Sequence, residues 1–313
     1  MRNFRMLAVG ATVLALLVSA CQSGGSSNPS PSSGSPSAPA ELPTVKIGSA
    51  NFDESAVVAE IYAQALEAAG FTVERHLYFG ARETTNPALE SGDLNLLPEY
   101  IGAMVVSLGG EPSSDADATF ATLRDLLAEH DLTAFAFADA ADSDAFAVTS
   151  ETAQARNLTT ISDLAPIAGD LTWGLPPECE TRPQCGIGLN ELYGIDVTAI
   201  PVETIDPCGS EMAQALASGA IDVGRVCSTQ PEIITDNLVV LEDDQGLDSA
   251  QNVAPVLRQD LADAGGSLLE STLNAVSAAL TTDDLTQLYY SVAIDAKDIG
   301  DVAHAWLVDN GLL

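Results

Sequence analysis

Basic side chains are scarce in this sequence. Its 313 residues include 11 lysines and arginines against 45 aspartates and glutamates, which gives a formal net charge of −34 at pH 7. Lys46 and Lys297 are the only lysines. A protein that binds nucleic acid neutralises phosphates with lysine and arginine, so the composition argues against a nucleic-acid partner. We interpret the acidity as an aid to solubility rather than as a dedicated cation site.

Residues typical of catalytic sites are also few. The three histidines, His76, His130 and His304, stand alone, and the sequence has no His-Glu-x-x-His motif, no Gly-x-Ser-x-Gly elbow and no glycine-rich phosphate loop. We therefore expect no enzymatic activity, no cofactor and no bound metal. An enzyme built on a binding fold stays as an alternative. A surface adhesin is another, although the sequence has no internal repeat.

A long apolar run is missing except near the N-terminus, which has the layout of an export signal. A basic start is followed by an apolar run and then by Ser19-Ala20-Cys21. The run is too short for a comfortable membrane span, so residues 1–20 are a predicted signal peptide. Cys21 resembles the lipidated cysteine of a bacterial lipobox, with an incidental cysteine as the alternative. Residues 21–43 are rich in Ser, Gly and Pro and are a predicted flexible linker. We therefore expect a lipid-anchored protein on the extracytoplasmic face of a bacterial cell membrane.

The remaining cysteines are Cys179, Cys185, Cys208 and Cys227. An even number in an exported chain indicates disulfides, and four cysteines allow three pairings. We favour Cys179–Cys185, which closes a tight loop, together with Cys208–Cys227. A four-cysteine zinc site is the competing interpretation, but the spacing contains no Cys-x2-Cys pair.

Strands and helices alternate along the folded part of the chain. Residues 45–49 and 71–79 are predicted strands with a helix between them. A third apolar strand is predicted to end at Pro98, because proline has no N–H to give to a central ladder. Such alternation is typical of a parallel sheet with right-handed crossovers. Glu99 and Tyr100 would then lie at the carboxyl end of a strand, where open α/β sheets bind ligands.

A polar stretch at residues 139–144 interrupts this pattern, and we interpret it as the first crossing between two lobes. A second set of elements follows, and then a strand at residues 252–258 that returns to the first sheet. The predicted domains are a discontinuous lobe I, made of residues 44–138 and 252–313, and an inserted lobe II of residues 139–251. Two such lobes can close on a ligand by hinging. The other strands predicted beyond residue 130 are 132–137, 145–149, 171–175, 197–202, 221–226 and 238–241.

The stretch around Pro98 carries a resemblance. Residues 92–102, Gly-Asp-Leu-Asn-Leu-Leu-Pro-Glu-Tyr-Ile-Gly, are similar to a Gly-Glu-Ile-Asp-Leu-x-Pro-Glu-Tyr-Thr-Gly signature. That signature belongs to the substrate-binding proteins of ABC transporters for glycine betaine, choline and related osmoprotectants. The resemblance implies an α/β fold of the two-lobed type II periplasmic-binding-protein class, with a ligand cleft between the lobes. Further segments that resemble the family in the same order are residues 48–52, 80–83, 177–194, 218–229, 254–258 and 309–313.

The resemblance also implies a function. Proteins of this family capture a small-molecule solute outside the cytoplasm and pass it to an ABC permease in the membrane, and we expect this one to be a monomer. A quaternary ammonium group cannot donate hydrogen bonds, so a protein holds it with aromatic faces and a nearby negative charge. The carboxylate of a betaine needs arginine or backbone N–H donors.

Side chains in the family-like segments supply both kinds of group. Tyrosines are candidates for an aromatic cage, Glu99 is a candidate counter-charge, and Arg182 is a candidate carboxylate partner in a loop that a disulfide would stiffen. Structural roles compete with these assignments: Tyr193 could pack a helix end, Phe52 could be a core residue, and Glu99 could cap a helix. The candidate ligand-binding residues are Tyr100, Tyr78, Tyr193, Arg182, Asn51, Phe52, Glu99, Ser228 and Thr229.

The sequence departs from the family pattern at three positions. Ala50 stands where the family often has lysine, Ile101 where it has threonine, and Cys227 where it often has an aromatic residue. Arg82 could hold a ligand carboxylate in place of Arg182, or could pair with a nearby glutamate. A different small polar solute, such as an amino acid, is therefore the alternative ligand. A surface lipoprotein without a transport role is the remaining alternative.

Overall fold

A computed structural model describes residues 42–313 of the chain. The predicted signal peptide (residues 1–20), the candidate lipidation site Cys21 and the predicted linker up to residue 41 lie outside these residues. None of the helices within the described range combines the length and the apolar character that crossing a bilayer requires.

The first of two mixed α/β units contains a five-stranded sheet of order β2-β1-β3-β10-β4. β1 pairs in parallel with β2 and β3, while β10 is antiparallel to both β3 and β4. Its strands are β1 (Thr44–Gly48), β2 (Thr72–His76), β3 (Leu96–Tyr100), β4 (Leu132–Ala134) and β10 (Val253–Arg258). Its helices are α1 (Asp53–Ala68), α2 (Arg82–Ser91), α3 (Ile101–Ser107), α4 (Ala116–Ala128), α9 (Gln259–Ala279), α10 (Thr282–Ala293) and α11 (Ile299–Asp309).

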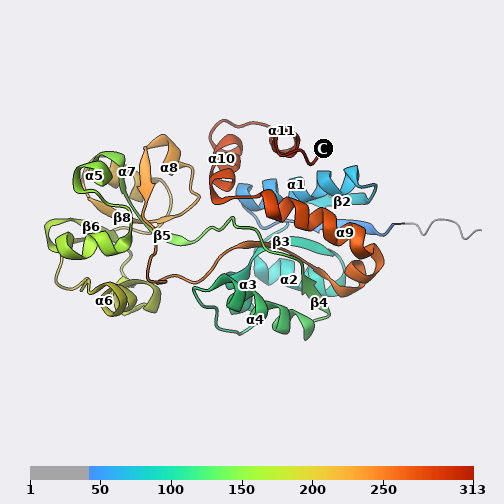
Figure 1. Ribbon diagram of the computed structural model, residues 1–313, viewed down its shortest axis with the longest axis horizontal. Coiled ribbons are helices and arrows are strands. Elements are labelled where there is room, and N and C mark those ends of the chain that lie inside the picture. The colour runs from blue at the N-terminus through green and yellow to red at the C-terminus, as the bar shows by residue number, and fades with distance from the viewer. Residues whose placement is uncertain (1–41) are drawn as a thin grey trace, which may run out of the picture. The chain divides into compact units, whose positions relative to one another are not determined.

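Helix α1 is the centre of this unit. Twelve of its 16 residues are buried, because it packs on the sheet and also contacts α9, α10 and α11. A helix that is apolar on nearly all sides is stable only when other elements surround it in this way. Figure 1 shows the C-terminal helices, in red, lying beside the N-terminal blue helix α1. The two ends of the described chain therefore build one core.

The second unit contains a five-stranded sheet of order β7-β6-β8-β5-β9. β6 pairs in parallel with β7 and β8, and β5 is antiparallel to β8 and β9. Its strands are β5 (Asp144–Thr149), β6 (Trp173–Leu175), β7 (Val202–Thr204), β8 (Val223–Cys227) and β9 (Leu238–Val240). Its α-helices are α5 (Ser150–Arg156), α6 (Gly188–Tyr193), α7 (Ser210–Ala217) and α8 (Glu232–Thr235), and a 3-10 segment covers Ile161–Asp170.

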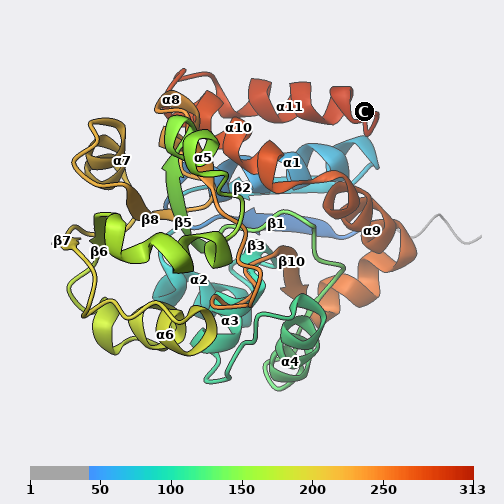
Figure 2. The same cartoon turned by 60° about the vertical axis from the view of Figure 1, so that its left-hand side comes forward.

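Two segments connect the units, and they run side by side. Val253 donates its N–H to the carbonyl of Ala140 at 2.9 Å, and Ala138 donates to the carbonyl of Val253 at 2.8 Å. Ala141 and Asn252 form an antiparallel bridge. Figure 1 shows the two segments, in green and orange, passing between the sheets. The units also meet where α8 lies next to α10, as Figure 2 shows.

The predicted two-lobed α/β fold class is confirmed. One sheet takes its strands from both ends of the described chain and the other from residues 144–240. The lobe boundaries 44–138 with 252–313, and 139–251, stay predictions.

The prediction that the third strand ends at Pro98 is wrong. β3 continues to Tyr100 in the middle of the sheet, and Pro98 lies directly opposite Pro255 of β10. Two facing prolines cannot exchange N–H bonds, so they occupy a pair whose backbone polar groups point away from each other. The carbonyl of Pro255 indeed accepts from Phe135 on its other side, at 3.1 Å. β1 has already ended beside this part of β3, so the missing N–H of Pro98 leaves no bond unmade.

Several other boundaries shift. The strand predicted at 197–202 is found at Val202–Thr204, and the one predicted at 71–79 ends at His76, because the chain turns where Tyr78 adopts a positive φ of 56°. Strand β4 ends at Ala134 rather than at residue 137.

Candidate functional site

Two aromatic side chains mark the carboxyl end of the first sheet. Phe52 precedes α1 and Tyr100 precedes α3, so each stands at the turn that follows a strand, and β1 and β3 are neighbours. Their rings stack with centroids 6.2 Å apart and planes inclined by 26°. Tyr100 is 8% exposed and Phe52 is 39% exposed. Ligands of open α/β sheets bind at such strand ends, so this stack is well placed to meet a solute.

A buried carboxylate lies against the stack. Glu54, in the first turn of α1, is only 1% exposed, and its Oε1 accepts a hydrogen bond from the Tyr100 hydroxyl. Its Oε2 is buried without a hydrogen-bond partner among the described residues. Burial, followed by the negative charge of Asp142, raises the pKa of Glu54 to about 7, although the hydroxyls of Thr229 and Tyr100 oppose this rise. Sequence analysis did not identify Glu54, because an acid in the first turn of a helix is common.

Asp142 is the second carboxylate of this site. It comes from the connection between β4 and β5, and its Oδ1 accepts from the backbone N–H of Thr229 at 3.3 Å. Burial raises its pKa and the negative charge of Asp144 adds to the rise, whereas hydrogen bonds from Thr229 and Ser228 lower it. Within residues 42–313 neither Glu54 nor Asp142 forms an ion pair. We refer to Glu54 and Asp142 as the acidic pair.

Ser228 and Thr229 follow β8 and hold the connection that carries Asp142. The Ser228 hydroxyl accepts from the N–H of Ser143 at 2.9 Å, and the backbone N–H of Ser228 donates to the carbonyl of Ser143 at 2.9 Å. Thr229 is buried. These two candidates therefore lie at the acidic pair, where residues of both units come together.

Glu99 is already paired. Arg82 donates to its Oε2 from Nε at 3.1 Å and from Nη2 at 2.8 Å, and the N–H of Tyr100 donates to the same oxygen at 3.2 Å. Burial raises the pKa of Glu99, while the charge of Arg82 lowers it. Glu99 and Arg82 are therefore ion-pair partners of each other.

Two neighbouring cavities are lined by the candidates Asn51, Phe52 and Arg182. One, of about 750 Å³, is lined by Asn51, Phe52 and Arg82 of the first unit. The second, of about 270 Å³, is lined by Arg182 and other residues of the second unit. Val106 lines both cavities, so the two are neighbours and the smaller one takes lining residues from both units.

Arg225 lies in the wall of the smaller cavity, and sequence analysis missed it. It is 4% exposed, and its Nη2 donates to Asp144 and to Asp248, both at 3.0 Å. Its Nη1 donates to the carbonyl of Gln184, and its guanidinium lies 5.6 Å from the centre of the Phe146 ring. Burial raises the pKa of Asp248 to about 7 against the opposing charge of Arg225. The sequence signal that could have identified Arg225 is an arginine within the otherwise apolar strand β8.

Arg182 and Tyr78 lie at the edges of this region. Arg182 is exposed and forms an ion pair with Glu178 at 2.8 Å. Tyr78 is also exposed, and its hydroxyl donates to Asp53 at 2.7 Å, next to Glu54 in the chain. Burial and the neighbouring Asp53 raise the pKa of Tyr78 to about 12.

Tyr193 lies elsewhere, in the apolar core of the second sheet. Its hydroxyl donates to Asp243 and accepts from the N–H of Gln245 at 2.9 Å. It lines neither of the two cavities. This placement favours the structural alternative, in which Tyr193 packs the end of α6.

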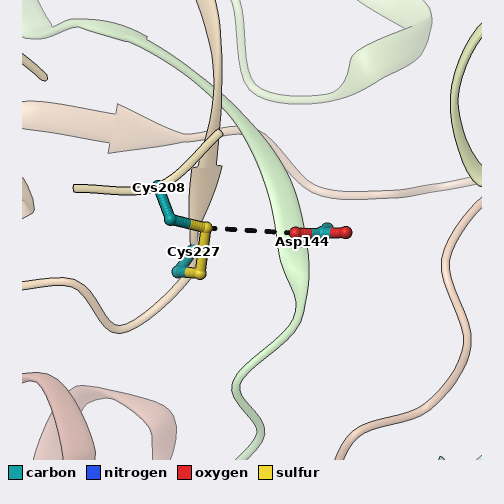
Figure 3. A group of neighbouring side chains, drawn as sticks. All are labelled: Asp144, Cys208 and Cys227. Carbon is teal, nitrogen blue, oxygen red and sulfur yellow. Dashed lines mark hydrogen bonds between the residues drawn. A yellow bond between two sulfur atoms is a disulfide. The ribbon is translucent and has the colours of Figure 1, made fainter. Parts of the chain in front are cut away.

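Both favoured disulfides are present, Cys179–Cys185 and Cys208–Cys227. Figure 3 shows Asp144 beside the second one, with its Oδ1 4.0 Å from the Sγ of Cys208. The three side chains lie close enough to hold a metal ion, but a sulfur in a disulfide is no thiolate ligand. The group therefore does not form a metal site while the disulfide is intact.

Comparison with known proteins agrees with the fold. A glycine betaine-binding protein of Escherichia coli, YehZ, is 24% identical over 277 residues, which cover 85% of this chain and 90% of that protein. The carnitine transport binding protein OpuCC of Listeria monocytogenes is 25% identical over 273 residues, covering 85% and 87%. A crystal structure described as a glycine betaine/carnitine/choline ABC transporter matches with a TM-score of 0.77 and 24% identity, over 86% of this chain and 99% of that one.

The family model described as the substrate binding domain of ABC-type glycine betaine transport systems matches residues 43–309. The resemblance inferred from the sequence motifs is thereby confirmed. Proteins of this family and fold are the substrate-binding components of transporters and not enzymes. Because the match spans most of the sequence, the chain belongs to the family of substrate-binding domains of ABC-type glycine betaine transport systems.

Proposed function

We propose that this protein is an extracytoplasmic, lipid-anchored receptor that captures a quaternary-ammonium osmoprotectant, such as glycine betaine or choline, between two hinged lobes. It then delivers the solute to an ABC permease. In this proposal the anchor is the lipidated Cys21 and the protein acts as a monomer. Membrane fractionation of a Cys21→Ser variant tests the anchor, because loss of the lipid releases the protein into the soluble fraction.

The acidic pair beside the Phe52–Tyr100 stack is the observation that carries this proposal. The buried Glu54 and the half-buried Asp142 have no basic partner among the described residues, and this favours a cation, because an uncompensated charge removed from water is costly. The adjacent aromatic faces suit a cation that cannot donate hydrogen bonds. A methylated ammonium group satisfies both conditions at once. The relatives named for glycine betaine and carnitine binding point to the same class of solute.

A thermal-shift screen of the full-length protein tests the proposal. The ligands are glycine betaine, proline betaine, carnitine, choline and proline. At about a hundred times the dissociation constant, a true ligand stabilises the fold by roughly 2.7 kcal/mol. For a protein of this size that corresponds to a rise in Tm on the order of 5–10 °C.

Phe52 and Phe79 provide a matched pair of variants. Both rings are similarly exposed, at 39% and 37%, but Phe79 packs against His76 and lines neither cavity. Phe52→Ala should weaken binding by about 0.5–2 kcal/mol through loss of an aromatic face, and Phe79→Ala should not. Stabilisation by an amino acid but by no quaternary ammonium compound would replace the proposed ligand class with the alternative one.

A further inference from the structure

The arginines that line the two cavities are all engaged with carboxylates. Arg82 binds Glu99, and Arg182 binds Glu178. Arg225 binds both Asp144 and Asp248. A ligand carboxylate that approached any of these arginines would compete with a carboxylate of the protein. The cavity walls therefore offer cationic side chains that are already neutralised.

The acidic pair stands in the opposite situation. Within the described residues it has no ion-pair partner, and the polar groups that contact it are hydroxyls and a backbone N–H. The charge of Asp142 raises the pKa of Glu54, so the two carboxylates titrate as a pair and gain negative charge as the pH rises. A ligand that brings one positive charge would compensate it.

The acidic pair and two further acids act on a third aromatic residue, Tyr289. Tyr289 of α10 is half-buried, and its pKa is raised by burial and then by the negative charges of Glu54, Asp53, Glu232 and Asp142. These acids come from α1, from α8 and from the connection before β5. The charges of Glu54, Asp142 and Glu99 likewise raise the pKa of Tyr100 after burial, so the field at both tyrosines is negative.

The start of α1 is another place where a ligand carboxylate could bind. Phe52 provides no side-chain cap, so N–H groups at this end could bind an anion. The first turn, however, already carries Asp53 and Glu54, and their charges occupy the favourable position at the positive end of the helix dipole. A second carboxylate placed there would face two acids at close range.

We propose that the acidic pair is a specificity determinant that selects a net-cationic quaternary ammonium solute, of the choline type, over zwitterionic betaines. The proposal rests on the proposed function and specifies its substrate class. Choline and glycine betaine share the trimethylammonium group, and they differ in that a hydroxymethyl group replaces the carboxylate. The comparison therefore isolates the effect of a ligand's negative charge.

Isothermal titration calorimetry of the full-length protein with these two ligands measures the selection. We expect choline to bind at least about tenfold more tightly, because like charges at a desolvated site disfavour the wrong partner. Glu54→Gln and Asp142→Asn keep side-chain size and remove one charge each. Each should weaken choline binding and leave glycine betaine binding unchanged or tighter, so that the affinity ratio falls toward one. Glu191→Gln removes the same charge from an exposed position on α6 and should keep the wild-type ratio.

The pH dependence of the wild-type protein gives a second readout that needs no variant. The titratable groups that interact with the acidic pair are Tyr100, Asp144 and Tyr289, and Asp53 and Glu232 act on Tyr289 in turn. Raising the pH from 6 to 8 ionises Glu54, whose pKa burial raises to about 7, and should tighten choline binding, while glycine betaine binding should not tighten. This readout decides the question if a variant fails to fold.

Three results would overturn the proposal. If glycine betaine binds as tightly as choline, the protein does not select choline over glycine betaine, and the proposed function is unaffected. If the ratio of choline affinity to glycine betaine affinity is unchanged in both variants, and the wild-type affinities do not change with pH, the acidic pair does not determine specificity. If neither ligand binds, and no other quaternary ammonium compound binds, the proposed function fails together with this inference.

Discussion

Replacing Glu54 by glutamine should change how the stability of the ligand-free protein depends on pH. Glu54 has its pKa raised from 4.5 to about 7, first by burial and then by the charge of Asp142. The folded state therefore holds a proton on Glu54 over a range of pH in which the unfolded state has released it. The stability that results is fully present below pH 4.5 and is lost as the pH rises through 7.

The size of the effect follows from the difference between these two pKa values. At 1.36 kcal/mol for each pH unit, the difference between 7 and 4.5 corresponds to about 3 kcal/mol of unfolding free energy. Glutamine does not titrate and still offers an oxygen to the Tyr100 hydroxyl. The unfolding free energy of the Glu54→Gln variant should therefore not show the decline with pH that Glu54 causes, whatever the absolute stability of the variant.

Urea unfolding at pH 5, 6, 7 and 8 measures the effect directly. Asp142 and Asp248 also have raised pKa values and contribute their own decline in both proteins, so the informative quantity is the difference between wild type and variant. We expect that difference to change by about 2.5 kcal/mol between pH 5 and pH 8 in favour of the variant, because part of the decline already occurs below pH 5. Glu191→Gln should run parallel to wild type. Parallel curves for Glu54→Gln and wild type would refute the assignment of Glu54 as a buried, protonated acid.

Two further predictions concern stability. Arg225→Met should destabilise the fold by roughly 3–5 kcal/mol, because Asp144 and Asp248 lose their buried partner. Adding Asp248→Asn to this variant should recover part of the lost unfolding free energy. If urea unfolding shows no recovery in the double variant, this account is contradicted. Replacing both cysteines of the 208–227 disulfide by serine should cost roughly 3 kcal/mol, and the same change in the 179–185 disulfide roughly 2 kcal/mol, because the first closes the longer loop. The reverse order in denaturant unfolding would show that loop length does not decide the effect.

Most strands and helices of the first unit could be predicted from sequence because they are long or strongly patterned, whereas the three-residue β4 was predicted too long. The helix α1 has apolar residues on nearly every face, and β10 is an uninterrupted apolar strand. The second unit was harder, since β6, β7 and β9 have three residues each. Strands of that length carry too little periodicity to fix their ends.

The Pro98 boundary shows a limit of a different kind. The rule that proline stops a central strand assumes that the neighbouring strands extend alongside it. Here β1 ends early, and the facing residue on β10 is itself a proline. Neither fact can be seen in the stretch around Pro98, because both depend on register with distant segments.

The acidic pair shows why half of the candidate site was predictable and the other half was not. Tyr100 lies in a contiguous motif at a strand end, so local pattern was enough to find it. Glu54 resembles any acid at a helix start, and Asp142 lies in a polar connection of ordinary composition. They meet because α1 begins directly after β1, while the connection that carries Asp142 is held beside residues 251 and 252 by a hydrogen bond and a bridge. Their proximity is thus a property of tertiary structure, and acids without a basic partner next to strand-end aromatics are the feature to seek once a fold of this class is known.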